Sequence, residues 1–257
     1  MTAVRLTGVE VTFTPRRATP VTALSGIDLD IERGAFVSLI GPSGCGKSTL
    51  LRVIADLVAP SSGSVEVLGG PPERARLDMR YGFAFQQATL FDWRTVQRNI
   101  ELPLTLAGMD RAARSERARA MLELVQLGDF AHHRPRELSG GMQQRVAIAR
   151  ALSFEPELLL MDEPFGALDE LAREHLQNEL LRIWRTTGTT TVFVTHSVAE
   201  AVFLSTKVVV LTPRPGRIHA VVDVPFGAER TSELRDSPEY FAAVTEVRKA
   251  LRSEGAL

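Results

Sequence analysis

The chain has 257 residues, is 44% hydrophobic, and sets 30 basic against 31 acidic residues for a formal net charge of −1. This composition is sufficient for one large α/β domain or two small ones, and it excludes the overall positive charge typical of proteins that hold nucleic acid. A single cysteine, Cys45, fits a reducing compartment, and no stretch resembles a membrane helix or a secretion signal, so we expect a cytosolic protein.

The first third of the chain has the pattern of strands and turns. β-branched and aromatic residues, interrupted by Gly and Pro, predict strands at residues 4–13, 27–32, 36–41, 64–70 and 81–86. From about residue 97 to 153 the pattern becomes helical. There Ala118, Met121, Leu122 and Val125 recur at i, i+3, i+4 and i+7, which places one apolar stripe on a helix face.

Strands return in the second half of the chain. Residues 157–163, 190–196 and 207–212 are apolar without alternation, as expected of parallel strands that are covered on both faces. A helix over 169–188, ending at Gly188, separates the first two. This alternation predicts a mostly parallel sheet. The last forty residues predict a short strand and then a charged amphipathic helix.

The sequence GPSGCGKSTL, residues 41–50, follows an apolar strand and leads into a helix. It matches the pattern G-x-x-x-x-G-K-[ST] through Gly41, Gly46, Lys47 and Ser48. Glycines let backbone N–H groups wrap an anion, Lys47 reaches the β- and γ-phosphates, and the Ser48 hydroxyl ligates Mg²⁺. A glycine-rich turn that happens to hold a lysine is the alternative, and the flanking strand and helix favour a phosphate-binding loop.

Two adjacent acids end the apolar strand at residues 157–163. Asp162 and Glu163 lie where open parallel sheets bind their ligands. Asp162 can hold Mg²⁺, and Glu163 can polarise a water for attack on the γ-phosphate. An ordinary turn at the strand end is the alternative, but two carboxylates there would be poorly compensated without a cation.

A third motif begins at Ser139. Ser139, Gly140 and Gly141 open a predicted helix, where Ser139 is a natural N-cap and the free N–H groups form a second anion site. One γ-phosphate does not need two such sites from one chain. We therefore expect this helix end to serve the nucleotide bound by another copy, so that the active form is a dimer.

Together the three motifs resemble those of the ATP-binding subunit of an ABC transporter, over nearly the whole chain. The resemblance implies a P-loop NTPase core with a mostly parallel sheet, an antiparallel N-terminal β subdomain and an inserted helical subdomain. It divides this single ATPase domain into a core at about residues 1–86 and 154–215, a helical subdomain at about 87–153, and a C-terminal strand and helix at about 216–257. The implied cofactors are ATP and Mg²⁺.

The resemblance also assigns roles to individual residues. Glu163 would be the catalytic base, Asp162 and Ser48 would hold the metal, and Lys47 would act in both binding and catalysis. The nucleotide would be bound by the Walker A loop, which comprises Gly41, Pro42, Ser43, Gly44, Cys45, Gly46, Lys47, Ser48 and Thr49.

Three further loop residues acquire a role only through the resemblance. Gln86 is similar to the catalytic glutamine that senses Mg²⁺ and the attacking water, and Gln87 is the alternative; Gln86 directly follows the predicted strand. His196 is similar to the switch histidine that contacts the γ-phosphate, although Ser197 follows it where the family more often has an acid. Asp169 is similar to the aspartate that crosses the dimer interface.

The signature motif and an N-terminal aromatic complete the implied nucleotide site. Ser139, Gly140 and Gly141 would contact the nucleotide of the other copy, and Met142 replaces the glutamine that is usual after them. Phe13 stands where the family has an aromatic that stacks on adenine. A lone aromatic is also typical of a hydrophobic core, and it is the resemblance that favours the stacking role for Phe13.

We expect a single ATPase domain with no fused membrane helices and no second ATPase domain in tandem, which fits an importer. Three longer segments resemble the nitrate, sulfonate and taurine group of importers: residues 91–104, 138–152 and 194–218. This resemblance implies a second ATPase subunit, transmembrane permease subunits gripped by residues 91–98, and a periplasmic or lipid-anchored solute-binding protein. It implies no nucleic acid, and a peripheral location on the cytoplasmic face of the inner membrane. Members similar to this group also import bicarbonate or vitamin precursors.

Two other classes share parts of this pattern. ATPase heads of DNA maintenance complexes have the same motifs, but a long coiled coil separates them, whereas here only about ninety residues lie between the first and third motifs and no heptads are sustained. A regulatory module that binds nucleotide without turnover would not need Glu163 and His196. The sequence therefore favours a transporter ATPase.

Overall fold

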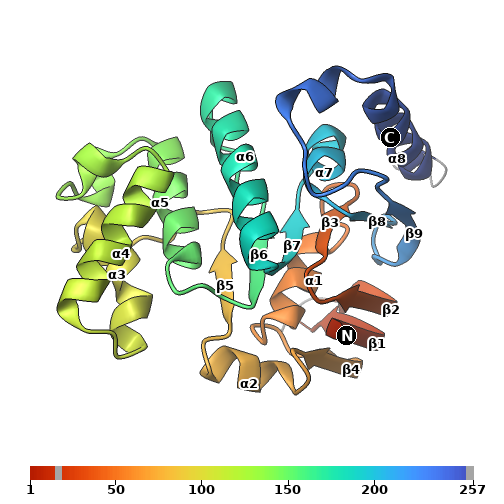
Figure 1. The fold of residues 1–257 in the computed structure, drawn as a ribbon. Coiled ribbons are helices and arrows are strands. Elements are labelled where there is room, and N and C mark those ends of the chain that lie inside the picture. Colours follow the sequence, from red (N-terminus) through yellow and green to blue (C-terminus); the bar gives the residue numbers. More distant parts are fainter. Residues whose placement is uncertain (15–18, 253–257) are drawn as a thin grey trace.

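The computed structural model describes residues 1–14 and 19–252. Within them the strands form two sheets, an antiparallel one of order β2-β1-β4 and a larger one of order β5-β6-β7-β3-β8-β9 (Figure 1). The antiparallel sheet consists of β1 (Thr2–Phe13), β2 (Val21–Glu32) and β4 (Ser62–Val67). The larger sheet consists of β3 (Phe36–Ile40), β5 (Tyr81–Ala84), β6 (Leu158–Asp162), β7 (Thr190–Val194), β8 (Lys207–Leu211) and β9 (Ile218–Asp223).

The larger sheet is mostly parallel. β3 pairs in parallel with β7 and β8, and β6 pairs in parallel with β5 and β7. β9 runs antiparallel to β8 at one edge. Every residue of β3, β6 and β7 is buried, because helices or the second sheet cover both faces of these strands. The predicted α/β class, with its mostly parallel core and its antiparallel N-terminal sheet, is confirmed.

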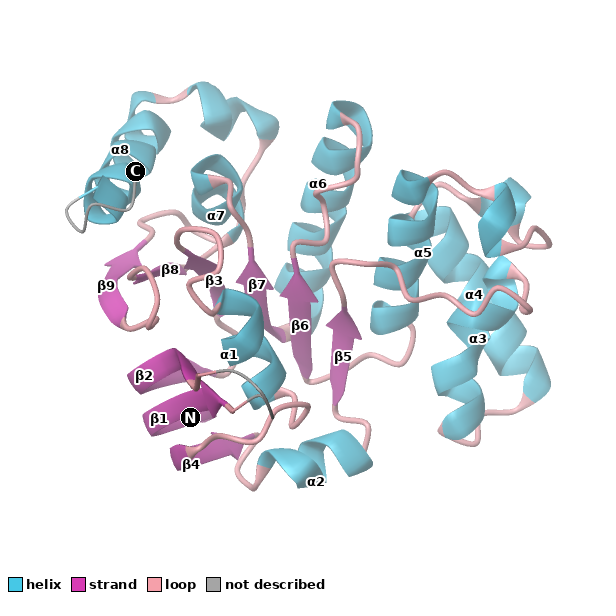
Figure 2. Ribbon diagram, turned by 180° about the vertical axis from the view of Figure 1, so that it is seen from behind, coloured by secondary structure: helices cyan, strands magenta, loops and turns pink. Residues whose placement is uncertain are grey.

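Helices cover both faces of this sheet (Figure 2). Alternate residues of β3 point to opposite faces: Val37 and Leu39 pack with α1 and the antiparallel sheet, whereas Phe36 and Ile40 pack with the helices beyond. The helices are α1 (Lys47–Ile54), α2 (Pro72–Leu77), α3 (Val96–Leu106), α4 (Arg111–Leu124), α5 (Gly140–Leu152), α6 (Glu170–Thr187), α7 (Val198–Leu204) and α8 (Pro238–Arg252). No helix in the described part of the chain has both the length and the apolar character that crossing a membrane requires.

Helices α3, α4 and α5 pack against one another beside β5, at the far end of the molecule from α8 (Figure 1). The predicted stripe of α4 and the residue after it are buried here, with Ala118 and Val125 fully inaccessible to solvent. Asp110 caps α4 by accepting hydrogen bonds from the N–H groups of Ala112 and Ala113. The inserted helical subdomain of the predicted fold is therefore present.

Several elements differ from the sequence-based expectation. β2 begins at Val21, six residues before the predicted start, and neither α2 nor α7 was predicted. Both helices have fewer than eight residues, which is too short for a clear 3.6-residue period. The apolar sequence of α7, VAEAVFL, also fits a strand. The predicted C-terminal strand and helix are β9 and α8, and the last part of the predicted segment, residues 253–257, lies outside the described residues.

Candidate nucleotide site

The phosphate-binding loop joins β3 to α1, and the glycines at its two ends leave no space for side chains. A Cβ at Gly41 would lie 2.8 Å from the carbonyl oxygen of Leu211, and one at Gly46 would lie 2.6 Å from Cδ2 of Leu24. Gly46 also has a φ of 102°, a conformation that L residues rarely adopt. The close approach of other strands thus explains why bare backbone is needed at both ends of the loop.

The Lys47 side chain is enclosed by its own loop. Its Nζ donates hydrogen bonds to the carbonyl oxygens of Gly41 (2.8 Å) and Pro42 (3.0 Å), and the residue is only 7% exposed. Cys45, a residue of the same loop, is 1% exposed, and its sulfur lies 3.8 Å from Nζ. The loop is therefore curled around a single ammonium group.

A cavity of about 430 Å³ opens in front of this loop. It brings together residues from both ends of the chain, including most of those predicted to bind nucleotide. Gly41, Pro42 and Cys45 form the back of the loop and do not line it. The lining residues are Phe13, Val21, Ala23, Ser43, Gly44, Gly46, Lys47, Ser48, Thr49, Gln86, Glu163 and Arg214.

Asp162 and Ser48 meet at the inner edge of this cavity. The Ser48 hydroxyl donates to Oδ1 of Asp162 at 2.7 Å, and Asp162 is 1% exposed. Burial raises the pKa of the Asp162 carboxyl, while the hydrogen bond from Ser48 acts in the opposite direction. Oδ2 is buried and has no hydrogen-bond partner within the described residues.

A buried carboxylate with an unpaired oxygen beside a hydroxyl fits a small divalent cation. Magnesium typically takes one or two protein oxygens and completes its coordination with water and substrate phosphates. No group of three or more His, Cys, Asp or Glu suited to a metal occurs in residues 1–14 and 19–252. The donor set of Ser48 and Asp162 is thus suited to a metal that is shared with a nucleotide.

Glu163 follows Asp162 and lies between two polar side chains. Nε2 of Gln86 donates to its Oε2 at 3.3 Å, and Nδ1 of His196 lies 3.6 Å from the same oxygen. Glu163 has a φ of 46°, in the left-handed region that costs a non-glycine residue about 1–2 kcal/mol. The strand end therefore holds this carboxylate in a conformation that is unfavourable on its own, which is common at catalytic sites. Gln87 does not line the cavity.

The loop that carries His196 depends on an acid that the sequence analysis missed. Glu200 accepts a hydrogen bond from the Thr195 hydroxyl, and Oγ1 of Thr195 accepts one from the Ser197 amide at 3.0 Å. Ser197 caps α7 and accepts from the Glu200 amide at 3.3 Å. Glu200 therefore fixes the residue that precedes His196. The pattern S-x-x-E before an apolar run is a capping-box signal that could have identified it.

The signature motif lies away from this cavity. Ser139 caps α5 by accepting from the amide of Met142 at 3.3 Å, and Gly141 lies so close to the loop between β6 and α6 that a Cβ would meet the carbonyl oxygen of Ala167 at 3.0 Å. Ser139, Gly140 and Gly141 are absent from the cavity lining, and strands β5 and β6 separate α5 from α1 (Figure 1). The Met142 side chain is half-buried and packs on the main core.

Asp169 and Phe13 occupy different edges of the site. Asp169 caps α6 and accepts from the Ala172 amide at 2.9 Å, just beyond the loop that contacts Gly141. Phe13 ends β1, lines the cavity and is 45% exposed. That exposure contradicts the interpretation of Phe13 as a core residue.

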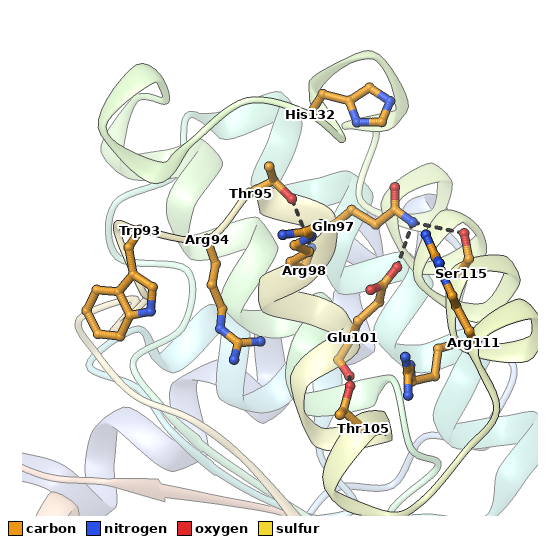
Figure 3. A pocket seen from close by; sticks show the side chains of 11 residues that line it. Trp93, Arg94, Thr95, Gln97, Arg98, Glu101, Thr105, Arg111, Ser115 and His132 are labelled. Carbon is orange, nitrogen blue, oxygen red and sulfur yellow. Dashed lines mark hydrogen bonds between the residues drawn. The ribbon is translucent and has the colours of Figure 1, made fainter.

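A second, larger cavity of about 950 Å³ lies on the helical subdomain (Figure 3). Gln97 of α3 donates to Glu101 (2.7 Å) and to Ser115 of α4 (3.0 Å), so it ties the two helices together below the opening. Trp93, at the edge of the opening, is 71% exposed. The other lining residues include four arginines, Arg94, Arg98, Arg111 and Arg114.

Comparison with known proteins agrees with this geometry. A family model described as ABC transporter matches residues 24–166, more than half of the chain. A protein of Brucella abortus whose name records only ATP binding is 48% identical, with 86% of this chain and 84% of the relative covered. The taurine import ATP-binding protein of Roseobacter denitrificans is 41% identical, with 93% and 90% covered. The aliphatic sulfonates import ATP-binding protein of Bacillus cereus is 44% identical, with 90% of each chain covered.

Solved structures give the same picture. A dimer of the ATP-binding cassette MJ0796 in a post-hydrolysis state, bound to ADP and Pi, has a TM-score of 0.79 at 34% identity and covers 87% of this chain and 100% of that chain. A second dimeric structure of MJ0796, a bacterial ABC transporter cassette, has a TM-score of 0.81 at the same identity and coverage.

Proposed function

The chain belongs to the ABC transporter family, and from this membership we propose that it is the ATPase subunit that powers import of a small solute through a separate membrane permease. The single observation that carries the proposal is the grouping of Gln86, Glu163 and His196 beside the phosphate-binding loop. A module that only binds nucleotide would have no use for a strained carboxylate held between an amide and an imidazole.

The hydrolytic step follows from these positions. Lys47 and the loop amides bind the phosphates, and Glu163 accepts a proton from a water whose oxygen attacks the γ-phosphorus. The bond from the γ-phosphorus to the bridging oxygen breaks, and ADP and phosphate form. Gln86 orients the water, and His196 donates to the γ-phosphate. Ser48, Asp162 and Gln86 would hold Mg²⁺, whose positive charge would offset the charge of the phosphates.

We further propose that two copies complete each site. The separation of α5 from α1 supports this, because Ser139 and Gly141 at the start of α5 do not line the nucleotide cavity of their own chain, so their helix N-terminus is placed to bind an anion held elsewhere. Both MJ0796 structures are dimers. Asp169, which begins the helix next to Gly141, would cross between the two copies. ATP binding closes the pair, and hydrolysis releases it.

The proposed solutes are sulfonates such as taurine, with nitrate and similar small compounds as further candidates. The relatives named for taurine and aliphatic sulfonates support this class, since each covers at least 90% of this chain. A role in a DNA maintenance complex, the alternative from the sequence, has no support from these relatives. The solute-binding protein of the system would reach this subunit only through the permease.

The cavity in Figure 3 is the proposed docking surface for the permease. Its lining contains four arginines and only one carboxylate, Glu101, among the described residues. This excess of positive charge fits a short permease segment that carries acidic side chains. The exposed ring of Trp93 offers an apolar anchor at its edge. Docking there would hold the subunit at the cytoplasmic face of the inner membrane. We also propose that the chain divides near residues 86, 153 and 215 into the core, the helical subdomain and the C-terminal strand and helix.

The function is tested with the subunit and its cognate permease in proteoliposomes. We expect taurine or another alkanesulfonate, presented with the solute-binding protein, to stimulate ATP hydrolysis and to accumulate in the lumen. The double substitution Arg94→Glu and Arg98→Glu should abolish co-purification with the permease while basal ATPase activity remains. Hydrolysis that no solute stimulates, in a complex that transports nothing, would contradict the proposal.

A further inference from the structure

The loop between β8 and β9, residues 212–217, is built against the phosphate-binding loop. Its ends are joined by hydrogen bonds between Thr212 and Arg217, at 2.9 Å and 3.0 Å. Gly216 donates to Ala23 on β2 at 2.9 Å and accepts from Ser25 at 3.0 Å. The fold thus fixes this loop to the strand that borders the nucleotide cavity.

The contact with the phosphate-binding loop is equally close. A Cβ at Gly216 would lie 2.0 Å from the carbonyl oxygen of Cys45, so only glycine fits there. Two residues earlier, Arg214 extends to the front of the same loop. Its Nε and Nη2 donate to the carbonyl oxygen of Gly44 at 3.3 Å and 3.2 Å. The guanidinium is therefore positioned by a residue 170 positions earlier in the chain.

Arg214 also lines the cavity itself. Among the described lining residues, Lys47 and Arg214 are the cationic ones. Lys47 is already bonded to two carbonyl oxygens of its loop, whereas Arg214 uses two of its five N–H donors on Gly44. The remaining donors of Arg214 are free to bind an anion, and a planar guanidinium suits phosphate oxygens particularly well.

We infer that Arg214 is a second cationic contact for the phosphate chain of the nucleotide, held in place by the Gly44 carbonyl. This inference rests on the nucleotide site of the proposed function and adds to it a residue outside the three motifs. Phosphate is the part of the nucleotide within reach, because Gly44 belongs to the loop that wraps the phosphates. The contact joins the β8–β9 loop directly to nucleotide binding by the single chain.

Isothermal titration of the isolated chain with MgADP and MgATP tests this inference. Loss of one charge-assisted hydrogen bond typically weakens binding by about 10- to 100-fold, and we expect Arg214→Ala to show this loss for both ligands. Arg214→Lys keeps the positive charge but not the planar set of N–H donors, so its affinity for both nucleotides should fall less. Arg217→Ala removes an arginine from the same loop without touching the cavity, so it should bind as the wild type does.

The dependence on salt separates a phosphate contact from mere support of the loop. Wild-type affinity should fall more steeply with ionic strength than that of Arg214→Ala, which has one ionic contact fewer. Equal nucleotide affinities of Arg214→Ala and the wild type would overturn the inference. It would also be overturned if Arg214→Lys lost as much affinity as Arg214→Ala and the salt dependence of the affinity did not change. Unchanged ADP binding with lost ATP-driven dimerisation would also overturn it and assign Arg214 to the partner copy. Failure of the wild type to bind either nucleotide would instead refute the proposed function.

Discussion

Glu163 combines a strained backbone with two polar neighbours that share its carboxylate oxygen. Replacement by glutamine keeps the size and the contact with Gln86 but removes the base. We expect Glu163→Gln to bind ATP normally and to hydrolyse it about 10²- to 10⁴-fold more slowly, measured by phosphate release in single-turnover conditions. Normal turnover in this variant would remove Glu163 from the role of catalytic base.

Asp162 is a second residue whose environment lowers the stability of the folded chain. Its pKa is raised mainly by burial, so the folded state binds its proton more readily than the unfolded state does. Stability therefore falls as the pH rises from the unfolded pKa through the raised folded pKa, and the full cost is present at neutral pH.

We accordingly expect Asp162→Asn to raise the unfolding midpoint of the nucleotide-free protein by about 1–4 °C at pH 7. The gain should shrink as the pH falls through the ordinary Asp pKa of about 3.9, because below it the wild-type carboxyl is protonated in the unfolded state as well as in the folded one. The same variant should lose stabilisation by MgATP. Calorimetry across this pH range measures both effects, and a gain that stays constant with pH would show that burial of charge is not the cause. Ser38→Ala, which changes a buried hydroxyl on the neighbouring part of the sheet, in β3, and removes no titratable group, serves as a control.

At the scale of elements, the loop after β7 is held by a polar network between α6 and α7. Glu200 bonds to Thr195 next to the switch histidine, Gln177 of α6 donates to Glu200 at 3.3 Å, and Arg173 of α6 lies 3.7 Å from it. Arg235, from the segment before α8, in turn donates to Gln177 at 2.5 Å. The position of His196 thus depends on residues from three elements.

Glu200 should therefore act as a positioning residue. We expect Glu200→Gln to lower kcat for ATP by about 10-fold with little change in KM, because a small displacement of His196 affects the reaction more than binding. Glu179→Gln, also on an acid that bonds to an arginine, is the matched control on α6. A parallel loss of thermal stability, or a change confined to KM, would indicate a merely structural or binding role.

The sequence predicted those elements whose pattern is local. The strands β3, β6 and β7 are continuous apolar runs, and the phosphate-binding loop is contiguous, so both could be identified without a structure. Arg214 and Glu200 were missed because their roles arise from packing. Arg214 meets Gly44 across 170 residues, and no periodicity in the sequence records such a contact. The short helix α7 was missed because seven residues do not establish a period.

At the scale of the whole molecule, the nucleotide cavity and the signature helix lie on different parts of one chain. The cavity is lined from β1, β2, the phosphate-binding loop, the start of α1 and the loops that carry Gln86, Glu163 and Arg214, whereas α5, which follows Ser139, lies beyond β5 (Figure 1). In the proposed function, a single copy contains both halves of a site but cannot bring them together. Hydrolysis by this chain should require two copies in antiparallel arrangement.

Complementation between two inactive variants tests this most directly. Lys47→Ala disables the phosphate-binding loop, and Ser139→Arg blocks the helix end that serves the other copy. A mixed dimer contains one intact site, formed by Lys47 of the Ser139 variant and Ser139 of the Lys47 variant. Since half of the dimers in an equal mixture are mixed and each has one working site, we expect about one quarter of the wild-type ATPase rate. A mixture as inactive as either variant alone would contradict a site shared between two copies.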